Sequence, residues 1–83
     1  MNLPNNDCHQ THLGFHIYNV DAVGTNYPPD AHTSVPYPSC HLISIRFYDT
    51  YGLLLFHKRN TFDWYMQNLE NGVWDSWKKI TFV

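Results

Sequence analysis

Six histidines and two cysteines are the residues best suited by type to metal or nucleophile chemistry. Four of them lie within nine residues near the N-terminus: Cys8, His9, His12 and His16. Zinc sites use such ligands as two closely spaced pairs, and Cys40–His41 could supply the second pair. The chain has no C-x-x-C pair, however, and on a strand His12 and His16 would lie about 13 Å apart. We therefore expect no metal and no cofactor, and these four residues are the candidates if a metal binds.

The sequence does not predict a catalytic site. A cysteine nucleophile needs a base within hydrogen-bond reach, and neighbours on a strand such as Cys40 and His41 point to opposite faces. A glycine-rich phosphate loop, a nucleophile elbow and an H-E-x-x-H motif are all missing from the sequence. The carboxylates at Asp49, Asp63, Glu70 and Asp75 lie beside predicted turns, where aspartate is common for local reasons. We predict that the protein is not an enzyme and has no catalytic residues.

Aromatic stacking is the chemistry that this sequence supports best. Trp64, Tyr65, Trp74 and Trp77 lie within fourteen residues, among aspartate, asparagine and glutamine. Flat rings can stack on the apolar face of a sugar while such polar neighbours bind its hydroxyls. Tryptophan also fills the core of a small domain, so we assign Trp74 and Trp77, together with Ile80, to the closing hairpin and the core. The ligand-binding residues are expected to be Tyr27, Tyr37, Tyr51 and Trp64.

The composition narrows the possible functions. Charged residues make up 14% of the chain and aromatic residues 17%, which is not the composition of a disordered tail. Lys and Arg number 5 against 7 Asp and Glu, which disfavours nucleic-acid binding through phosphates. The longest apolar run, 53–56, is far short of the roughly 20 residues of a membrane-spanning helix. The N-terminus also lacks the basic and apolar regions of a signal peptide.

The chain is short enough that its stability is a question in itself. Its 83 residues allow one domain, 1–83. Two cysteines cannot form a disulfide framework; we expect free thiols, although Cys8 and Cys40 could form one bridge. Domains of this size bury only about 60–65% of their unfolded surface, and oligomerisation is the common remedy. An aromatic-rich surface with few charges is typical of a subunit interface.

Strand patterns dominate the chain, and helix patterns are weak. We predict strands over 12–20, 41–48, 53–57 and 63–69, and a terminal strand that includes Ile80 and Phe82. Within 41–48, Ile43, Ile45 and Phe47 share one face, and Ser44 and Arg46 the other. Turns are predicted at 49–52 and at Asn71-Gly72, the strongest hairpin signal in the chain. The fold class is therefore all-β, a small antiparallel meander or sandwich.

A proline-rich loop excursion is predicted over 24–39. Four of the five prolines lie in this segment. Because proline fixes φ and removes a backbone donor, such a loop is stiff. It would present Tyr27 and Tyr37 as a contact surface.

The C-terminal half resembles the knob-type domains at the tips of phage tail fibres and R-type pyocin fibres. Those domains end with an aromatic strand, a polar turn containing Asn-Gly, and a W-x-x-W-x-x-I signature, found here at Trp74, Trp77 and Ile80. The segments 43–48 and 53–58 fit the strand and its return before that hairpin. The resemblance covers residues 40–82, and Gln67 stands near the place of the family's usual arginine.

The resemblance implies a non-enzymatic, homotrimeric receptor-binding tip whose subunits are packed or intertwined. Its partner would be a bacterial surface polysaccharide or an outer-membrane protein, with no nucleic acid and no membrane insertion. Its location would be the virion or an extracellular particle, after synthesis in the host cytoplasm. Two alternatives remain: a trimerisation or assembly module of a fibre without its own ligand, and a small His/Cys metal-binding module.

Overall fold

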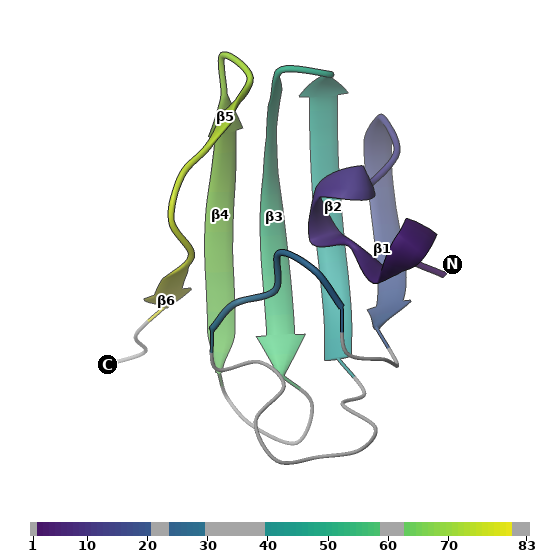
Figure 1. Cartoon of the computed structure of the whole chain (residues 1–83), viewed down its shortest axis with the longest axis vertical. Coiled ribbons are helices and arrows are strands. Elements are labelled where there is room, and N and C mark those ends of the chain that lie inside the picture. Colours follow the sequence, from purple (N-terminus) through teal and green to yellow (C-terminus); the bar gives the residue numbers. More distant parts are fainter. Residues whose placement is uncertain (1, 21–23, 30–39, 59–62, 81–83) are drawn as a thin grey trace.

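The computed structural model describes residues 2–20, 24–29, 40–58 and 63–80 of the chain. Its elements are η1 (Pro4–Asn6), η2 (Cys8–Gln10), β1 (Gly14–Val20), β2 (Cys40–Tyr48), β3 (Tyr51–Lys58), β4 (Trp64–Glu70), β5 (Val73–Trp74) and β6 (Lys78–Ile80). The strands pair antiparallel in the order β1-β2-β3-β4-β5, and β6 also pairs with β4 (Figure 1). The predicted all-β antiparallel meander is confirmed.

The two hairpin turns differ in how well the sequence predicts them. Asn71 and Gly72 both have positive φ, 52° and 80°, as an Asn-Gly hairpin turn requires. The turn between β2 and β3 is tighter than expected, because β3 begins at Tyr51 and Gly52 lies inside the strand. A Cβ at Gly52 would lie 2.6 Å from the carbonyl oxygen of Ile45. Glycine is therefore needed at position 52 because the backbone of β2 passes too close for a side chain, and not because of the turn.

The first strand is shorter than predicted at its N-terminal end. It begins at Gly14, whose φ of 96° is a conformation that glycine adopts readily. The chain before Gly14 therefore leaves the strand direction. As a result the rings of His12 and His16 lie 6.1 Å apart, and not about 13 Å as two positions on one strand would.

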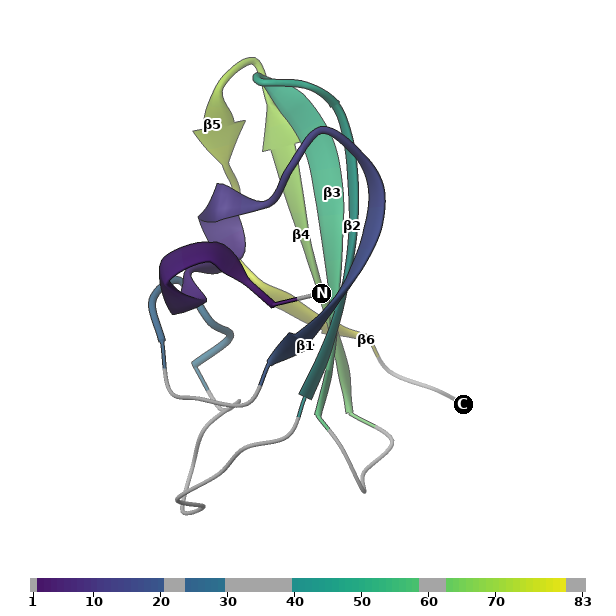
Figure 2. The same cartoon turned by 90° about the vertical axis from the view of Figure 1, so that its right-hand side faces the viewer.

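One face of the sheet, the inner face, is covered by the N-terminal segment. Figure 2 shows η1, η2 and the segment 24–29 on the same side of the sheet, with β5 curling toward that side. The backbone of Thr25 joins this cover by bonds with Asn6 and Cys8. The buried apolar core lies between the cover and the sheet: Leu3, Cys8, Tyr18, Val20, Tyr27, Cys40, Leu42, Leu54, Phe56, Tyr65 and Leu69.

Polar side chains on the inner face attach the cover to the sheet. Arg46 is buried, and its Nη1 donates to the carbonyl oxygen and hydroxyl of Thr11 at 3.3 and 3.2 Å. Gln67 is buried as well; its Nε2 donates to the carbonyl oxygen of Asp75 at 2.7 Å, and its Oε1 lies 2.8 Å from His9 Nε2. These bonds connect β2 to Thr11 and β4 to His9, both far away in the sequence, and they connect β4 to Asp75 just beyond the next turn.

The opposite face of the sheet, the outer face, carries apolar side chains in rows that cross the strands. Directly paired residues of neighbouring strands share a face, so the register defines each row. The middle row is Ile17, Ile43, Leu55, Met66 and Lys78. The upper row is Phe15, Ile45, Leu53 and Asn68. The lower row is Asn19, His41, His57, Trp64 and Ile80.

Within the described part of the chain, no segment covers the outer face (Figure 2). Phe15 is 62% exposed and Ile17 is 55% exposed, although both belong to a strand of the sheet. The predicted division of β2 into two faces is confirmed: Ile43, Ile45 and Phe47 lie on the outer face, opposite Ser44 and Arg46. It is the polar pair that is buried.

Candidate ligand-binding site

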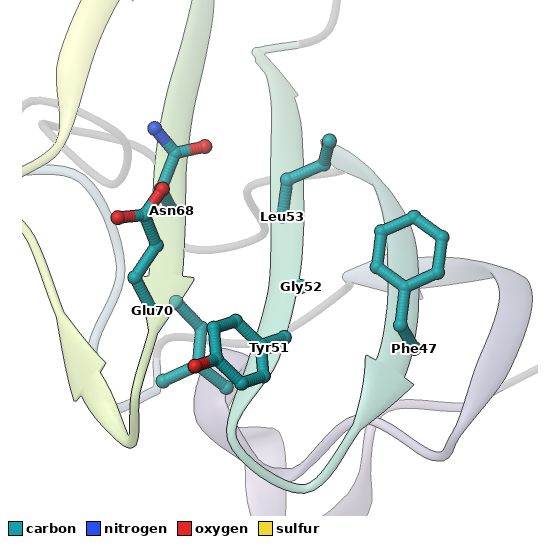
Figure 3. Close-up of a pocket in the computed structure, with 7 residues that line it drawn as sticks. Phe47, Tyr51, Gly52, Leu53, Asn68 and Glu70 are labelled. Carbon is teal, nitrogen blue, oxygen red and sulfur yellow. The ribbon is translucent and has the colours of Figure 1, made fainter.

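A shallow hollow opens at the β2–β3 end of the outer face (Figure 3). Its volume is about 230 Å³, and we call it the β2–β3 hollow. It is lined by Phe47, Tyr51, Gly52, Leu53, Asn68, Leu69 and Glu70. The hollow thus combines two aromatic rings, an amide and a carboxylate.

The strand ends position these side chains. The β2–β3 register shifts between Arg46 and Tyr48. Phe47 therefore lies at a bulge, near the C-terminal end of β2. Tyr51 begins β3, and its ring meets that of Tyr48 edge to face with centroids 6.5 Å apart. Glu70 ends β4 just before the Asn71 turn. The hollow is therefore built from the neighbouring ends of three consecutive strands.

The hollow can supply both an apolar surface and hydrogen bonds. Phe47 is 66% exposed and Tyr51 is 43% exposed, so both rings are available to a ligand. Figure 3 shows Asn68 and Glu70 projecting side by side from β4. Within the described part of the chain, neither of these two side chains forms a hydrogen bond of its own. Among the described residues that line it, Glu70 is the charged one, so the hollow favours neutral or cationic ligands over anionic ones.

The hollow includes one of the predicted ligand-binding residues, Tyr51. Trp64 lies in the lower row of the outer face, away from it. There Trp64 stacks on His57, with centroids 4.4 Å apart, and His57 stacks on His41 at 5.8 Å. The structure therefore places Tyr51 and Trp64 on the same face but in different sites.

Tyr27 does not occupy a surface position. It is only 8% exposed, and its ring packs against Phe56 with centroids 5.5 Å apart. The expectation of a ligand contact at Tyr27 is therefore corrected: the segment 24–29 folds onto the inner face and takes this ring into the core. Tyr37 lies outside the described residues.

The residues of the W-x-x-W-x-x-I signature occupy both faces. Trp74 stacks on His9 with centroids 4.0 Å apart, and Trp77 packs edge to face on Phe56 at 6.0 Å. Both tryptophans are partly buried against the core, as their predicted core role requires. Ile80, predicted to share that role, pairs with Trp64 on the outer face.

The candidate metal ligands do not converge. Cys8 is buried in the core, and His9 is used in the stack on Trp74. His16 Nε2 lies 2.7 Å from the carbonyl oxygen of Leu13. Across residues 2–20, 24–29, 40–58 and 63–80, no group of three or more His, Cys, Asp or Glu side chains is arranged to hold a metal ion.

Sequence reasoning missed Phe47, Asn68 and Glu70 as members of a site. A signal for them was present, because alternation along 64–70 places positions 68 and 70 on the face of Trp64 and Met66. The register between strands was not predictable, and only the register brings Leu53 opposite Asn68 and Gly52 opposite Leu69.

Comparison with known proteins gives no relative for this chain. No protein-family model matches it, and no curated protein or solved structure matches it at a significant level. Among the described residues, no helix has the length and apolar character needed to cross a membrane.

Proposed function

We propose that this protein binds a bacterial cell-surface glycan without catalysing a reaction, as a receptor-binding tip domain of the phage or pyocin fibre type. The observation that carries the proposal is the β2–β3 hollow, in which exposed rings lie beside a free amide and a free carboxylate. The resemblance over residues 40–82 supports the same class of function.

A sugar fits the chemistry of the hollow. The ring of Tyr51 would stack on the apolar face of a pyranose. The Asn68 amide would donate and accept hydrogen bonds with the sugar hydroxyls, and the Glu70 carboxylate would accept hydrogen bonds from them. Because Glu70 places a negative charge in the hollow, neutral sugars and amino sugars should bind better than uronic or sialic acids. An open hollow also suits an internal unit of a long polysaccharide.

The test begins with an array of purified bacterial lipopolysaccharides and capsular polysaccharides. The repeat unit that binds best is then titrated into the protein, and its dissociation constant is followed by amide chemical shifts. Tyr51→Ala should weaken binding about tenfold, because a stacking contact of about 1.4 kcal/mol corresponds to a factor of ten. Tyr51→Phe should stay within about threefold, since the ring is retained.

The polar half of the hollow is tested by Glu70→Ala, which should weaken binding by about tenfold or more through the loss of charge-assisted hydrogen bonds. Asp49→Ala is the matched control, because it removes an exposed carboxylate next to the hollow but outside its lining. No binding on the array, or equal losses in the Glu70 and Asp49 variants, would refute the proposed site.

A further inference from the structure

The outer face is the largest feature that the proposed function leaves unexplained. A sheet normally buries at least one apolar face against a second layer of structure. Here the inner face has its layer, but the outer face carries Phe15, Ile17 and Phe47 at more than half exposure. Large contiguous apolar patches are rare on monomeric proteins and mark interaction surfaces.

The outer face has the size of a stable protein interface. Its rows cross β1, β2, β3, β4 and β6, so the face is about 19 Å wide at a strand spacing of about 4.8 Å. β3, with its 8 residues, is about 26 Å long at about 3.3 Å per residue. Each copy thus offers roughly 500 Å², and two copies would bury about 1,000 Å² or more, the lower limit for a specific interface.

The face is also complementary to itself. Its upper and middle rows are apolar across β1, β2 and β3, which is the pattern of the core of a subunit interface. Among the described residues, its charges are Glu70 at one end and Lys78 at one edge, of opposite sign, so two copies would not repel each other. A nucleic acid or an acidic partner would need basic side chains, which these rows lack except at Lys78.

We propose that the outer face packs against the outer face of another copy of this chain. The Ile17–Ile43–Leu55–Met66 row then forms the centre of a two-sheet core, a layer that a single chain does not supply. The β2–β3 hollow lies at one end of this surface, where an interface becomes polar and accessible. The inference does not rest on glycan binding.

The test is the molar mass of the protein in solution, measured by sedimentation equilibrium from 1 to 100 µM. The wild-type chain should form a dimer, because a face that packs on the same face of a second copy closes with two chains. Ile17→Lys should raise the dissociation constant at least tenfold, because it places an unpaired charge in the apolar middle row, at its β1 end. Phe15→Ser should do the same without adding charge. Both residues are exposed in the single chain, so circular dichroism at 1 µM should show an unchanged fold.

Thr25→Lys is the matched control, since it adds the same charge at an exposed position of the cover on the opposite side. It should leave the mass unchanged. A single-chain mass at 100 µM would overturn the inference, and so would an oligomer that persists equally in Ile17→Lys and Phe15→Ser.

The two proposals fail separately in this design. Glu70→Ala removes sugar binding and should leave the oligomer intact, whereas Ile17→Lys dissociates the oligomer and should keep the chemical-shift response of Tyr51 to a single repeat unit. A mass of two chains would support the two-sheet contact. A mass of three would match the homotrimer implied by the fibre-tip resemblance and would overturn the packing of two outer faces on each other.

Discussion

Arg46 is a buried cation that is held by carbonyl oxygens and an aromatic ring. Its guanidinium donates to Thr11 and to the carbonyl oxygen of Asp49 at 3.1 Å, and it lies 5.5 Å from the centre of the Trp74 ring. Within the described part of the chain, no carboxylate forms an ion pair with it. Arg46 therefore holds both the cover and the β2–β3 turn in place. These contacts compensate for burying its charge on the inner face.

Cys8 is the residue whose chemistry is changed most by folding. Burial raises the pKa of the Cys8 thiol well above its ordinary value, and the nearby Asp7 and Cys40 raise it further. Because the thiolate is the reactive form, a thiol reagent at pH 8 should modify the native chain far more slowly than the urea-unfolded chain. Absorbance of the released reagent anion measures both rates. Full modification of the native chain within the mixing time would contradict this prediction.

The raised pKa of the Cys8 thiol makes the stability of the fold depend on pH. A thiol that binds its proton more tightly in the folded state gives full stabilisation below its unfolded pKa, and this stabilisation is lost as the pH rises. Unfolding free energy should therefore fall above about pH 8.5, by up to about 1.4 kcal/mol per pH unit. Urea unfolding from pH 8 to 10 measures this slope, and Cys8→Ala should show a shallower one. Equal slopes in the two proteins would exclude Cys8 as the cause.

Among the elements, β4 joins the sheet both to the cover on its inner face and to the segment that follows β5. Its inner side chain Gln67 bonds to His9 of η2 and to the chain between β5 and β6. Gln67→Ala leaves these partners without their bonds and should lower the unfolding free energy by about 1–3 kcal/mol. Asn19→Ala, an exposed position on β1, should change it by no more than about 0.5 kcal/mol. Urea unfolding followed by tryptophan fluorescence tests both, and equal effects would show that Gln67 does not secure the cover.

Strand positions and faces were predictable, but burial was not. Alternation in β2 correctly divides Ile43, Ile45 and Phe47 from Ser44 and Arg46. The usual inference from such a pattern is that the apolar side is the core. Here the inner face receives the cover because Tyr18, Leu42 and Phe56 pack there, and those contacts join segments too distant in sequence for a local pattern to reveal.

The residues of the candidate site were predictable only in part, because most of them are brought together by contacts between strands. The exposed position of Tyr51 follows from the turn predicted beside it, whereas Tyr27 was expected on a loop surface and lies in the core. Phe47, Asn68 and Glu70 are joined only by the register of β2, β3 and β4. Register depends on pairing across the whole sheet, so residue types alone did not predict the hollow.

For the molecule as a whole, the low charge and high aromatic content have a physical explanation in the sheet. Charged residues are 14% of the chain, and the three rows of the outer face include only Lys78 among them. A chain whose stability depends on a second layer would be selected to keep that face apolar. Within the described part of the chain, aromatic side chains lie both in the inner core and on the outer face, and two of them line the β2–β3 hollow.

This distribution predicts how self-association responds to salt. Because the proposed contact buries apolar rows, sodium chloride between 50 and 500 mM should change the dissociation constant by less than about threefold, although exposed charges are strongly screened over that range. Sodium sulfate should strengthen the association, since it is excluded from protein surfaces and favours burial. Sedimentation at each salt concentration measures both effects, with Thr25→Lys as the control for added surface charge. Dissociation by sodium chloride alone would mean that charged groups, and not the outer face, hold the copies together.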